Sequence, residues 1–244
     1  MDGLARRIAR TIVRRFVPHW PYPVLKGPLK GARLILGSFS GDGGGASVYF
    51  GQMEPEQTAA ICDTLGRGKV FFDVGANVGY YTILASPLVS DEGRVVAFEP
   101  VMRNLTFLQR HVQLNSAQNV SILPFAVSDS CGLARFSFGS GHALGHLDKA
   151  ERSKTIVPTI TLDRIAEEMG IIPDVIKIDV EGGESEVLAG AARILKQAKP
   201  AIFLSTHSPQ LRAACLQYLS EFGYSVKPLL AGDDVHEFVA KCDQ

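Results

Sequence analysis

The sequence has no excess of charge of either sign. Its 244 residues contain 25 Lys and Arg against 25 Asp and Glu, so the formal net charge at pH 7 is zero. A protein that binds nucleic acid generally needs a basic surface that attracts phosphates. The charge balance therefore argues against nucleic acid as a partner.

Cysteine is scarce, and long apolar runs are absent. No two of the four cysteines form a C-x-x-C pair, so their spacing indicates neither a zinc knuckle nor a redox pair. We expect reduced thiols in a cytoplasmic protein. No apolar segment has the length of a membrane span. Arg14 and Arg15 interrupt the one early apolar stretch, so we also expect no signal peptide.

Positive charge is concentrated near the start of the chain. Residues 1–33 contain eight Lys and Arg and a single Asp. Leu4, Ile8, Ile12 and Phe16 recur at four-residue spacing, which predicts a basic amphipathic helix that ends at Pro18. This helix either lies on an anionic membrane surface, at its inner face, or packs on its own domain or on a partner in a homodimer. We expect residues 1–17 to be the only membrane contact.

Hydrophobic residues make up 46% of the chain, which is enough for one sizeable core. We expect residues 1–55 to form the basic helix, a proline-rich connector and a lead-in hairpin with a glycine-rich loop over 41–45. From residue 56 to residue 244, predicted strands and helices alternate, which indicates a parallel sheet covered by helices on both faces. A hairpin is predicted around Cys131-Gly132, one helix over 185–196, and an antiparallel strand pair at the end.

The segment from Val70 to Val89 is the most informative part of the chain. A short apolar strand ends in Asp73-Val74, and Gly75, Asn77 and Gly79 then form a tight turn before an apolar helix. Glycines allow a ligand to approach the backbone closely, and the carboxyl ends of strands are where open α/β sheets bind ligands. The acid favours a cationic ligand group.

Glu99 ends the next predicted strand, twenty residues after Gly79. A carboxylate at this place can accept both hydroxyls of a ribose. A cationic group together with a ribose describes S-adenosylmethionine. The main alternative is a nicotinamide dinucleotide, but its G-x-G-x-x-G fingerprint would require a third glycine that this loop lacks. Asp129, at the end of another predicted strand, is a further candidate for donor binding.

A second group of polar residues follows the later strands. Asp179 ends the strand Val175 to Ile178, Glu181 lies two residues beyond it, and His207 follows the strand Ala201 to Leu204. These groups are candidates for orienting and deprotonating an acceptor, with His207 as the first choice of base because imidazole titrates near neutrality. The same three groups can in principle hold a divalent metal, but no tight ligand spacing is present, and a metal-free site is expected.

Taken together, four motifs resemble the FkbM family of methyltransferases. They are Asp73-Val-Gly-Ala-Asn-Val-Gly-Tyr-Tyr-Thr82, Val96-Ala-Phe-Glu-Pro100, Thr161-Leu-Asp163 and Lys177-Ile-Asp-Val-Glu-Gly-Gly-Glu184. The resemblance covers roughly residues 27 to 227. It implies a class I methyltransferase fold with a doubly wound, mostly parallel seven-stranded sheet and a terminal antiparallel strand. It also implies S-adenosylmethionine as methyl donor.

Carried onto this chain, the resemblance assigns donor binding to Asp73, Gly75, Asn77, Gly79 and Glu99, and places Asp179 and Glu181 by the reacting centre. It implies O-methylation of a hydroxyl on a sugar, a glycolipid or other lipid-linked molecule, or a polyketide-type product. The chain departs from the family where the fifth strand often ends in Glu-x-His, because it has Ser205-Thr-His207. Two alternatives therefore stay open, a non-catalytic donor-binding scaffold and a nicotinamide-dependent oxidoreductase.

Overall fold

The computed structural model describes residues 20–35, 37–39, 45–138, 145–147, 153–230 and 235–242. The predicted basic helix and most of the glycine-rich loop lie outside these ranges. Within them, no helix combines the length and the apolar character that crossing a membrane requires.

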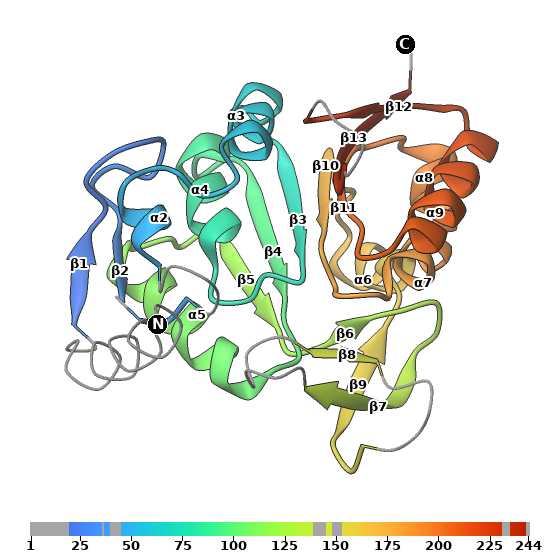
Figure 1. Ribbon diagram of the computed structural model, residues 1–244, viewed down its shortest axis with the longest axis horizontal. Coiled ribbons are helices and arrows are strands. Elements are labelled where there is room, and N and C mark those ends of the chain that lie inside the picture. Colours follow the sequence, from blue (N-terminus) through green and yellow to red (C-terminus); the bar gives the residue numbers. More distant parts are fainter. Residues whose placement is uncertain are drawn as a thin grey trace, which may run out of the picture.

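Seven strands form the central sheet, in the spatial order β12-β13-β11-β10-β3-β4-β5 (Figure 1). β13 runs antiparallel to both of its neighbours, and the other pairs are parallel. The predicted class I methyltransferase sheet is therefore confirmed, with its antiparallel strand inserted between β11 and β12. The bounds are β3 (Val70–Val74), β4 (Arg94–Phe98), β5 (Val120–Leu123), β10 (Val175–Ile178), β11 (Ala201–Ser205), β12 (Tyr224–Pro228) and β13 (Glu237–Cys242).

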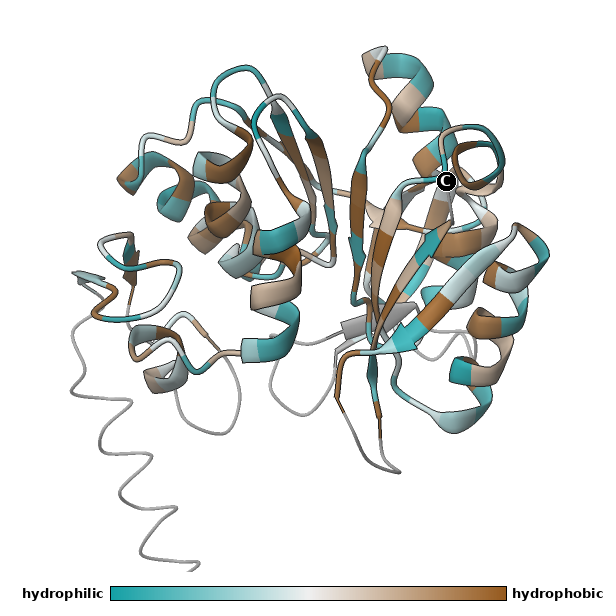
Figure 2. Ribbon diagram, turned by 90° about the horizontal axis from the view of Figure 1, so that it is seen from above, coloured by the Kyte–Doolittle hydropathy of each residue, from teal (hydrophilic) through white to brown (hydrophobic). Residues whose placement is uncertain are grey.

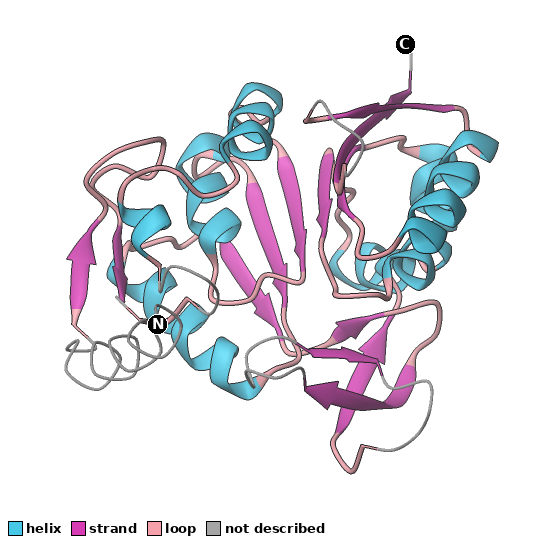
Figure 3. Ribbon diagram, viewed as in Figure 1, coloured by secondary structure: helices cyan, strands magenta, loops and turns pink. Residues whose placement is uncertain are grey.

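Helices cover both faces of this sheet (Figure 3). Successive side chains of a strand point to opposite faces, so Phe71 packs with Ile61 and Leu84 while Phe72 packs with Ile165 and Leu188. Apolar strands lie between helices whose outer surfaces are more polar (Figure 2). The helices are α3 (Pro55–Thr64), α4 (Tyr80–Val89) and α5 (Met102–Leu114) on one side, and α6 (Leu162–Met169), α7 (Glu184–Ala189), α8 (Ala192–Gln197) and α9 (Pro209–Glu221) on the other.

The single helix predicted over 185–196 is wrong, because the chain breaks at Gly190 into α7 and α8. The carboxylate of Asp163 accepts hydrogen bonds from the backbone N–H groups of Arg193 and Ile194, at 2.8 and 3.0 Å. It therefore caps a new helix start, which apolar spacing alone does not reveal.

A second, smaller sheet lies beside the carboxyl ends of the central strands. It contains β6 (Ala126–Val127), β7 (Gly132–Phe138), β8 (Gly145–Leu147) and β9 (Ile156–Ile160) in the order β6-β9-β7-β8. The predicted hairpin of β6 with β7 is wrong, because β9 lies between them and pairs with both. With β9 between β6 and β7, the side chains of Ala126, Phe136 and Val157 are buried in one cluster with Val101.

The lead-in segment packs on the main domain. It contains β1 (Pro21–Pro23), β2 (Arg33–Ile35) and α2 (Ala46–Tyr49). The expected lead-in hairpin is present, but β2 pairs with β1, which lies in the segment expected to be the proline-rich connector. Val24 and Tyr49 are buried in the same cluster as Ile61 of α3 and Leu84 of α4.

Candidate functional site

One cavity runs along the carboxyl ends of β3, β4, β5 and β10. It encloses about 970 Å³ when the open space at its mouth is included, at the upper end of the size range of small-molecule sites. Gly75, Asn77, Glu99, Asp179 and Glu181 all line it. Of the strand-end residues expected along this edge of the sheet, Glu99, Asp179 and Glu181 line the cavity, whereas Asp73 and His207 are not among its lining residues.

The loop after β3 is held between its two neighbouring strands. The N–H groups of Gly75 and Ala76 both donate to the carbonyl of Phe98, at 3.1 and 2.9 Å. Gly75 has φ 78°, and a Cβ at this position would overlap the carbonyl oxygen of Asp179. Only glycine fits here, so the donor-binding loop and the loop that carries Asp179 touch through backbone atoms.

Glu99 lies at the end of β4, with its carboxylate in the cavity wall. One oxygen accepts the N–H of Asn77 and the other accepts the N–H of Val101, both at 2.8 Å. The residue is only 4% exposed, and burial raises the pKa of its carboxyl to about 7. Glu99 thus fixes the glycine-rich loop and still presents oxygen lone pairs to the cavity.

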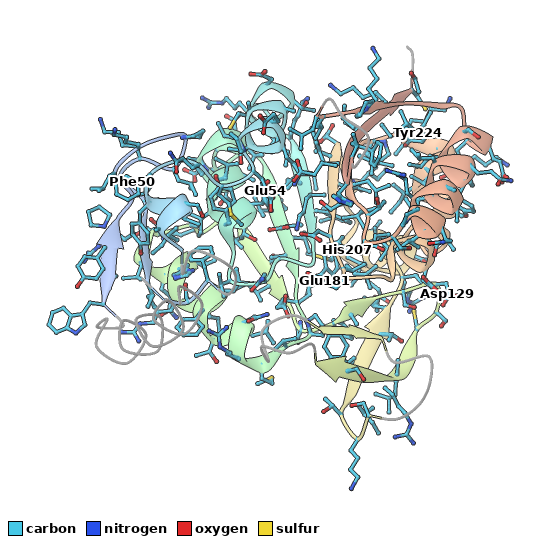
Figure 4. All side chains as sticks on the ribbon, viewed as in Figure 1. Phe50, Glu54, Asp129, Glu181, His207 and Tyr224 are labelled. Atoms are coloured by element: carbon cyan, nitrogen blue, oxygen red, sulfur yellow. The ribbon has the colours of Figure 1, made fainter. Side chains whose placement is uncertain are left out.

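Three predicted donor contacts lie elsewhere. Asp73 is fully buried and accepts a hydrogen bond from the hydroxyl of Thr82 at 2.6 Å, and burial raises its pKa. Gly79 begins α4 where a Cβ would press on Leu108. Asp129 is exposed and bonded to neighbouring serine hydroxyls, away from Glu181 and His207 (Figure 4). None of the three lines the cavity, so their positions support structural roles rather than direct contact with the donor.

Asp179, Glu181 and His207 form a cluster, and Asp179 and Glu181 also line the cavity. Glu181 and His207 are labelled close together in Figure 4. Nε2 of His207 lies 3.5 Å from Oδ1 of Asp179 and 3.4 Å from Oε2 of Glu181. Nδ1 of the same ring is 2.8 Å from Oε1 of the fully buried Glu184. The hydrogen bond with Glu184, together with the other two carboxylates, raises the pKa of His207 to about 9. Burial raises the pKa of Glu181.

Lys177 is a site residue to which the sequence analysis gave no role. Its Nζ lies 3.4 Å from Oδ2 of Asp179 and 3.8 Å from Oδ1 of Asp73, and it donates to the carbonyl of Gly75 at 3.2 Å. Burial alone would lower the pKa of Lys177, but Asp179 and Asp73 outweigh it and the net change is upward. A lone charge inside the apolar strand Val175 to Ile178 was the available signal.

Two carboxylates near the cluster were also missed or read differently. Glu184, the last residue of the fourth motif, begins α7 and also holds the ring of His207. Glu237 on β13 pairs in register with Ser205, the position where the family often has an acid. Burial, and then the charges of Glu54 and Asp179, raise the pKa of Glu237 to about 7. The pairing of β11 with β13 is a long-range contact that local sequence does not indicate.

Comparison with known protein families decides the class of protein. The family model described as "Methyltransferase FkbM domain" matches residues 73–226, which is more than half of the chain. The chain belongs to the FkbM family of methyltransferases. The resemblance identified from the four sequence motifs is therefore confirmed.

One curated protein and two solved structures are similar to this FkbM-family chain. It is 33% identical over 147 residues to "Hexuronic acid methyltransferase AglP" of Haloferax volcanii, covering 59% of this chain and 58% of that protein. The fold is similar to the crystal structure of "Methyltransferase FkbM" from Methylobacillus flagellatus KT, with TM-score 0.54 and 19% identity over 71% of this chain and 43% of that one. It is also similar to a "ribosomal protein L11 methylase" from Lactobacillus delbrueckii subsp. bulgaricus, with TM-score 0.55 and 13% identity over 88% and 87% of the two chains. The chain thus spans less than two thirds of the first two proteins.

The methyl donor of this FkbM-family enzyme is S-adenosylmethionine. The cavity residues fit it. The Oδ1 atom of Asn77 is buried at the cavity and has no hydrogen-bond partner within the described residues, so a polar ligand group is available to satisfy it. Gly75 leaves room for the donor beside the loop, and Glu99 is placed to accept ribose hydroxyls.

Proposed function

We propose that this FkbM-family methyltransferase methylates a hydroxyl oxygen on a sugar, a glycolipid or other lipid-linked glycan, or a polyketide-type product. One observation carries the proposal: the donor loop and the carboxylates of Asp179 and Glu181 line the same cavity. A methyl group on the donor and a hydroxyl beside these carboxylates would therefore meet in one enclosed space. The relative named as a hexuronic acid methyltransferase supports a sugar acceptor.

The bound donor supplies an activated methyl group on a sulfonium, so the protein mainly has to align the acceptor and remove a proton. Asp179 is paired with Lys177 at 3.4 Å, so its carboxylate is already engaged with a cation. In the described part of the chain no lysine forms an ion pair with Glu181, and burial raises the pKa of its carboxyl, so we assign it the hydroxyl proton. His207 is in contact with three carboxylates, and we assign it the role of holding Asp179 and Glu181 in position.

This assignment modifies the hypothesis that a free imidazole is the base, but it keeps His207 and Asp179 essential. We expect His207→Gln and Asp179→Asn to lower the single-turnover rate by about 10²-fold or more. Affinity for S-adenosylhomocysteine should change little, because neither side chain belongs to the donor loop. The rates are measured in single-turnover experiments with an identified acceptor. Calorimetry of the same variants measures their affinity for S-adenosylhomocysteine. Wild-type rates in both variants would remove this cluster from the reaction.

The alternatives make different predictions for the same protein. A donor-binding scaffold would bind S-adenosylhomocysteine but transfer no methyl group to a broad panel of acceptors. A nicotinamide-dependent oxidoreductase would bind NAD or NADP, whereas a methyltransferase should not. Titrating all three ligands into the full-length protein separates these functions.

A further inference from the structure

Asp179, Glu181 and His207 each offer one possible metal-binding atom in the same small region. These three atoms all lie within 4.8 Å of one another, and the two separations from Nε2 of His207 are 3.4 and 3.5 Å. Adjacent ligands of a cation bound at about 2.1 Å stand roughly 3.0–3.4 Å apart in octahedral or tetrahedral shells. Two of the separations therefore need only a small contraction to match a coordination shell.

The imidazole of His207 is held in the orientation of a metal ligand. Its Nδ1 contacts Oε1 of Glu184, which is 0% exposed and also accepts the N–H of Gly182 at 3.1 Å. A carboxylate that accepts the Nδ1–H of a histidine holds the ring in the arrangement usual behind metal-bound histidines, and a cation at Nε2 would displace the proton that the surrounding carboxylates otherwise keep there. The other oxygen of Glu184 is buried without a hydrogen-bond partner in the described part of the chain.

Negative groups outnumber positive ones around this region. Lys177 is the lysine that reaches Asp179, and it is shared with Asp73. The charge of Asp179 acts on Glu181 and Glu237, and the charge of Glu184 acts on Glu181. Within the described residues, no lysine or arginine forms an ion pair with these three acids. A divalent cation would balance this excess, because buried or half-buried carboxylates need a positive partner.

We propose that Asp179, Glu181 and His207 bind one divalent cation of the Mg²⁺ or Mn²⁺ class, which holds the acceptor hydroxyl. This inference rests on the proposed O-methylation. Two carboxylates and one imidazole suit Mn²⁺, with Mg²⁺ as the cation of similar geometry. The side chains are 28%, 34% and 34% exposed, so coordination positions are open to water and acceptor oxygens. Two adjacent hydroxyls of a sugar would occupy two such positions.

The cation assists the step in a defined way. A hydroxyl bound to it becomes more acidic, and its proton passes to the oxygen of Glu181 that does not coordinate the cation. The resulting oxygen forms a bond to the methyl carbon of the donor. The carbon–sulfur bond breaks, its electron pair stays on sulfur, and the neutral thioether leaves.

The test uses the full-length protein after treatment with EDTA, with Mn²⁺ alone as the probe. Calorimetry and electron paramagnetic resonance should detect one Mn²⁺ site per chain, and Mg²⁺ should compete for it. Glu181→Gln and His207→Ala should each weaken Mn²⁺ binding at least about tenfold. Glu92→Gln is the matched control, because Glu92 is an exposed carboxylate paired with Arg67. Nitrogen hyperfine coupling from a bound imidazole should appear in the wild type and vanish in His207→Ala.

A parallel titration with S-adenosylhomocysteine keeps the two proposals separate. The metal-free wild type and the Glu181→Gln variant should both bind it, which also shows that the variant is folded. If they bind it and the wild type takes up no Mn²⁺, or if Glu181→Gln binds Mn²⁺ as tightly as wild type, the cation site is overturned and the methyltransferase assignment stands. If the metal-free wild type does not bind S-adenosylhomocysteine, the proposed function itself is contradicted.

Discussion

At the scale of single residues, two buried ionisable side chains, Glu99 and Lys177, hold the site together. Glu99 fixes the glycine-rich loop through the N–H of Asn77 and lines the cavity. Lys177 lies under the cavity between Asp73 and Asp179. Each side chain supports both the fold and the ligand site, so substitutions at these positions must be read with separate measurements of stability and binding.

The affinity for the donor should depend on pH through Glu99. Burial raises the pKa of this carboxyl from 4.5 to about 7. Between these two pH values the folded protein holds a proton on Glu99 that the unfolded chain has lost. The contribution of Glu99 to the free energy of unfolding therefore falls as the pH rises from 4.5 to about 7. Ribose hydroxyls donate to the ionised form, which predominates above pH 7. Affinity for S-adenosylhomocysteine should therefore rise between pH 6 and 8, by up to about tenfold per pH unit below the pKa.

Calorimetry across this pH range tests the prediction. Glu99→Gln keeps the size of the side chain but cannot ionise, so its affinity should be lower and its dependence on pH weaker. Glu92→Gln should behave as wild type, because its carboxylate lies on the surface in a pair with Arg67. An equal pH dependence in wild type and Glu99→Gln would remove Glu99 from donor binding.

Removing Lys177 should destabilise the fold. Its Nζ is the lysine partner of the fully buried Asp73, and taking away one member of a buried ion pair costs about 3–5 kcal/mol. We expect Lys177→Met to lower the free energy of unfolding by about that amount in urea titrations, against a near-zero effect for Lys196→Met on the surface of α8. Equal stabilities of the two variants would show that Asp73 does not need the lysine charge.

The sequence located the ligand-binding edge correctly but did not determine which acids face the cavity. Glu99 and Asp179 follow their strands directly and line it. Asp73 is still inside β3, where the alternation of side chains turns it toward Thr82 of α4. The prediction for Asp129 assumed a hairpin of β6 with β7, which does not form. Glu237 reaches the site through strand pairing across 32 residues of sequence from Ser205, which no local pattern contains.

At the scale of elements, the contact between two loops controls the site. Gly75 after β3 packs against the backbone of Asp179 after β10. The N–H of Asp179 also donates to the carbonyl of Val74 at 3.1 Å, which joins the two loops at their base. Short apolar strands followed by a polar residue were predicted well, as in β3, β10 and β11. The boundary between α7 and α8 depends on Asp163, a distant cap, and was not predictable from apolar spacing.

Gly75→Ala should damage the protein more than Gly68→Ala. Both glycines have left-handed φ values, 78° and 79°, so both substitutions cost about 1 kcal/mol of backbone strain. Only a Cβ at Gly75 would overlap other atoms, since nothing lies within 4 Å of one at Gly68. We expect Gly75→Ala alone to lose at least about tenfold in affinity for S-adenosylhomocysteine. Equal losses in the two variants would contradict the role of the loop contact.

At the scale of the whole molecule, the lead-in segment joins the main core through Val24, Leu34 and Tyr49. The chain before it carries the predicted basic helix, and the first described residue, Trp20, is 69% exposed. An exposed tryptophan after a basic segment suits the surface of an anionic membrane. A contact with a second copy of the chain is the other hypothesis for this end of the molecule.

Deleting residues 1–17 should leave donor affinity unchanged, because the seven strands described for the central sheet all lie between Val70 and Cys242. Calorimetry with S-adenosylhomocysteine checks this, and reduced affinity would place the segment at the donor site. Flotation with anionic vesicles, with neutral vesicles as control, tests the membrane hypothesis. Equal flotation of full-length and truncated protein would exclude it, and sedimentation of both then tests dimerisation.

The most direct test of the central claim is transfer of a labelled methyl group. The full-length protein is given S-adenosylmethionine with a deuterated methyl group and extracts of glycans and lipids from its host, and products are analysed by fragmentation mass spectrometry. The account predicts a deuterated methyl on a hydroxyl oxygen, with transfer strongly reduced in Asp179→Asn although that variant still binds S-adenosylhomocysteine. Transfer to nitrogen, sulfur or carbon, or full transfer by the Asp179→Asn variant, would contradict it.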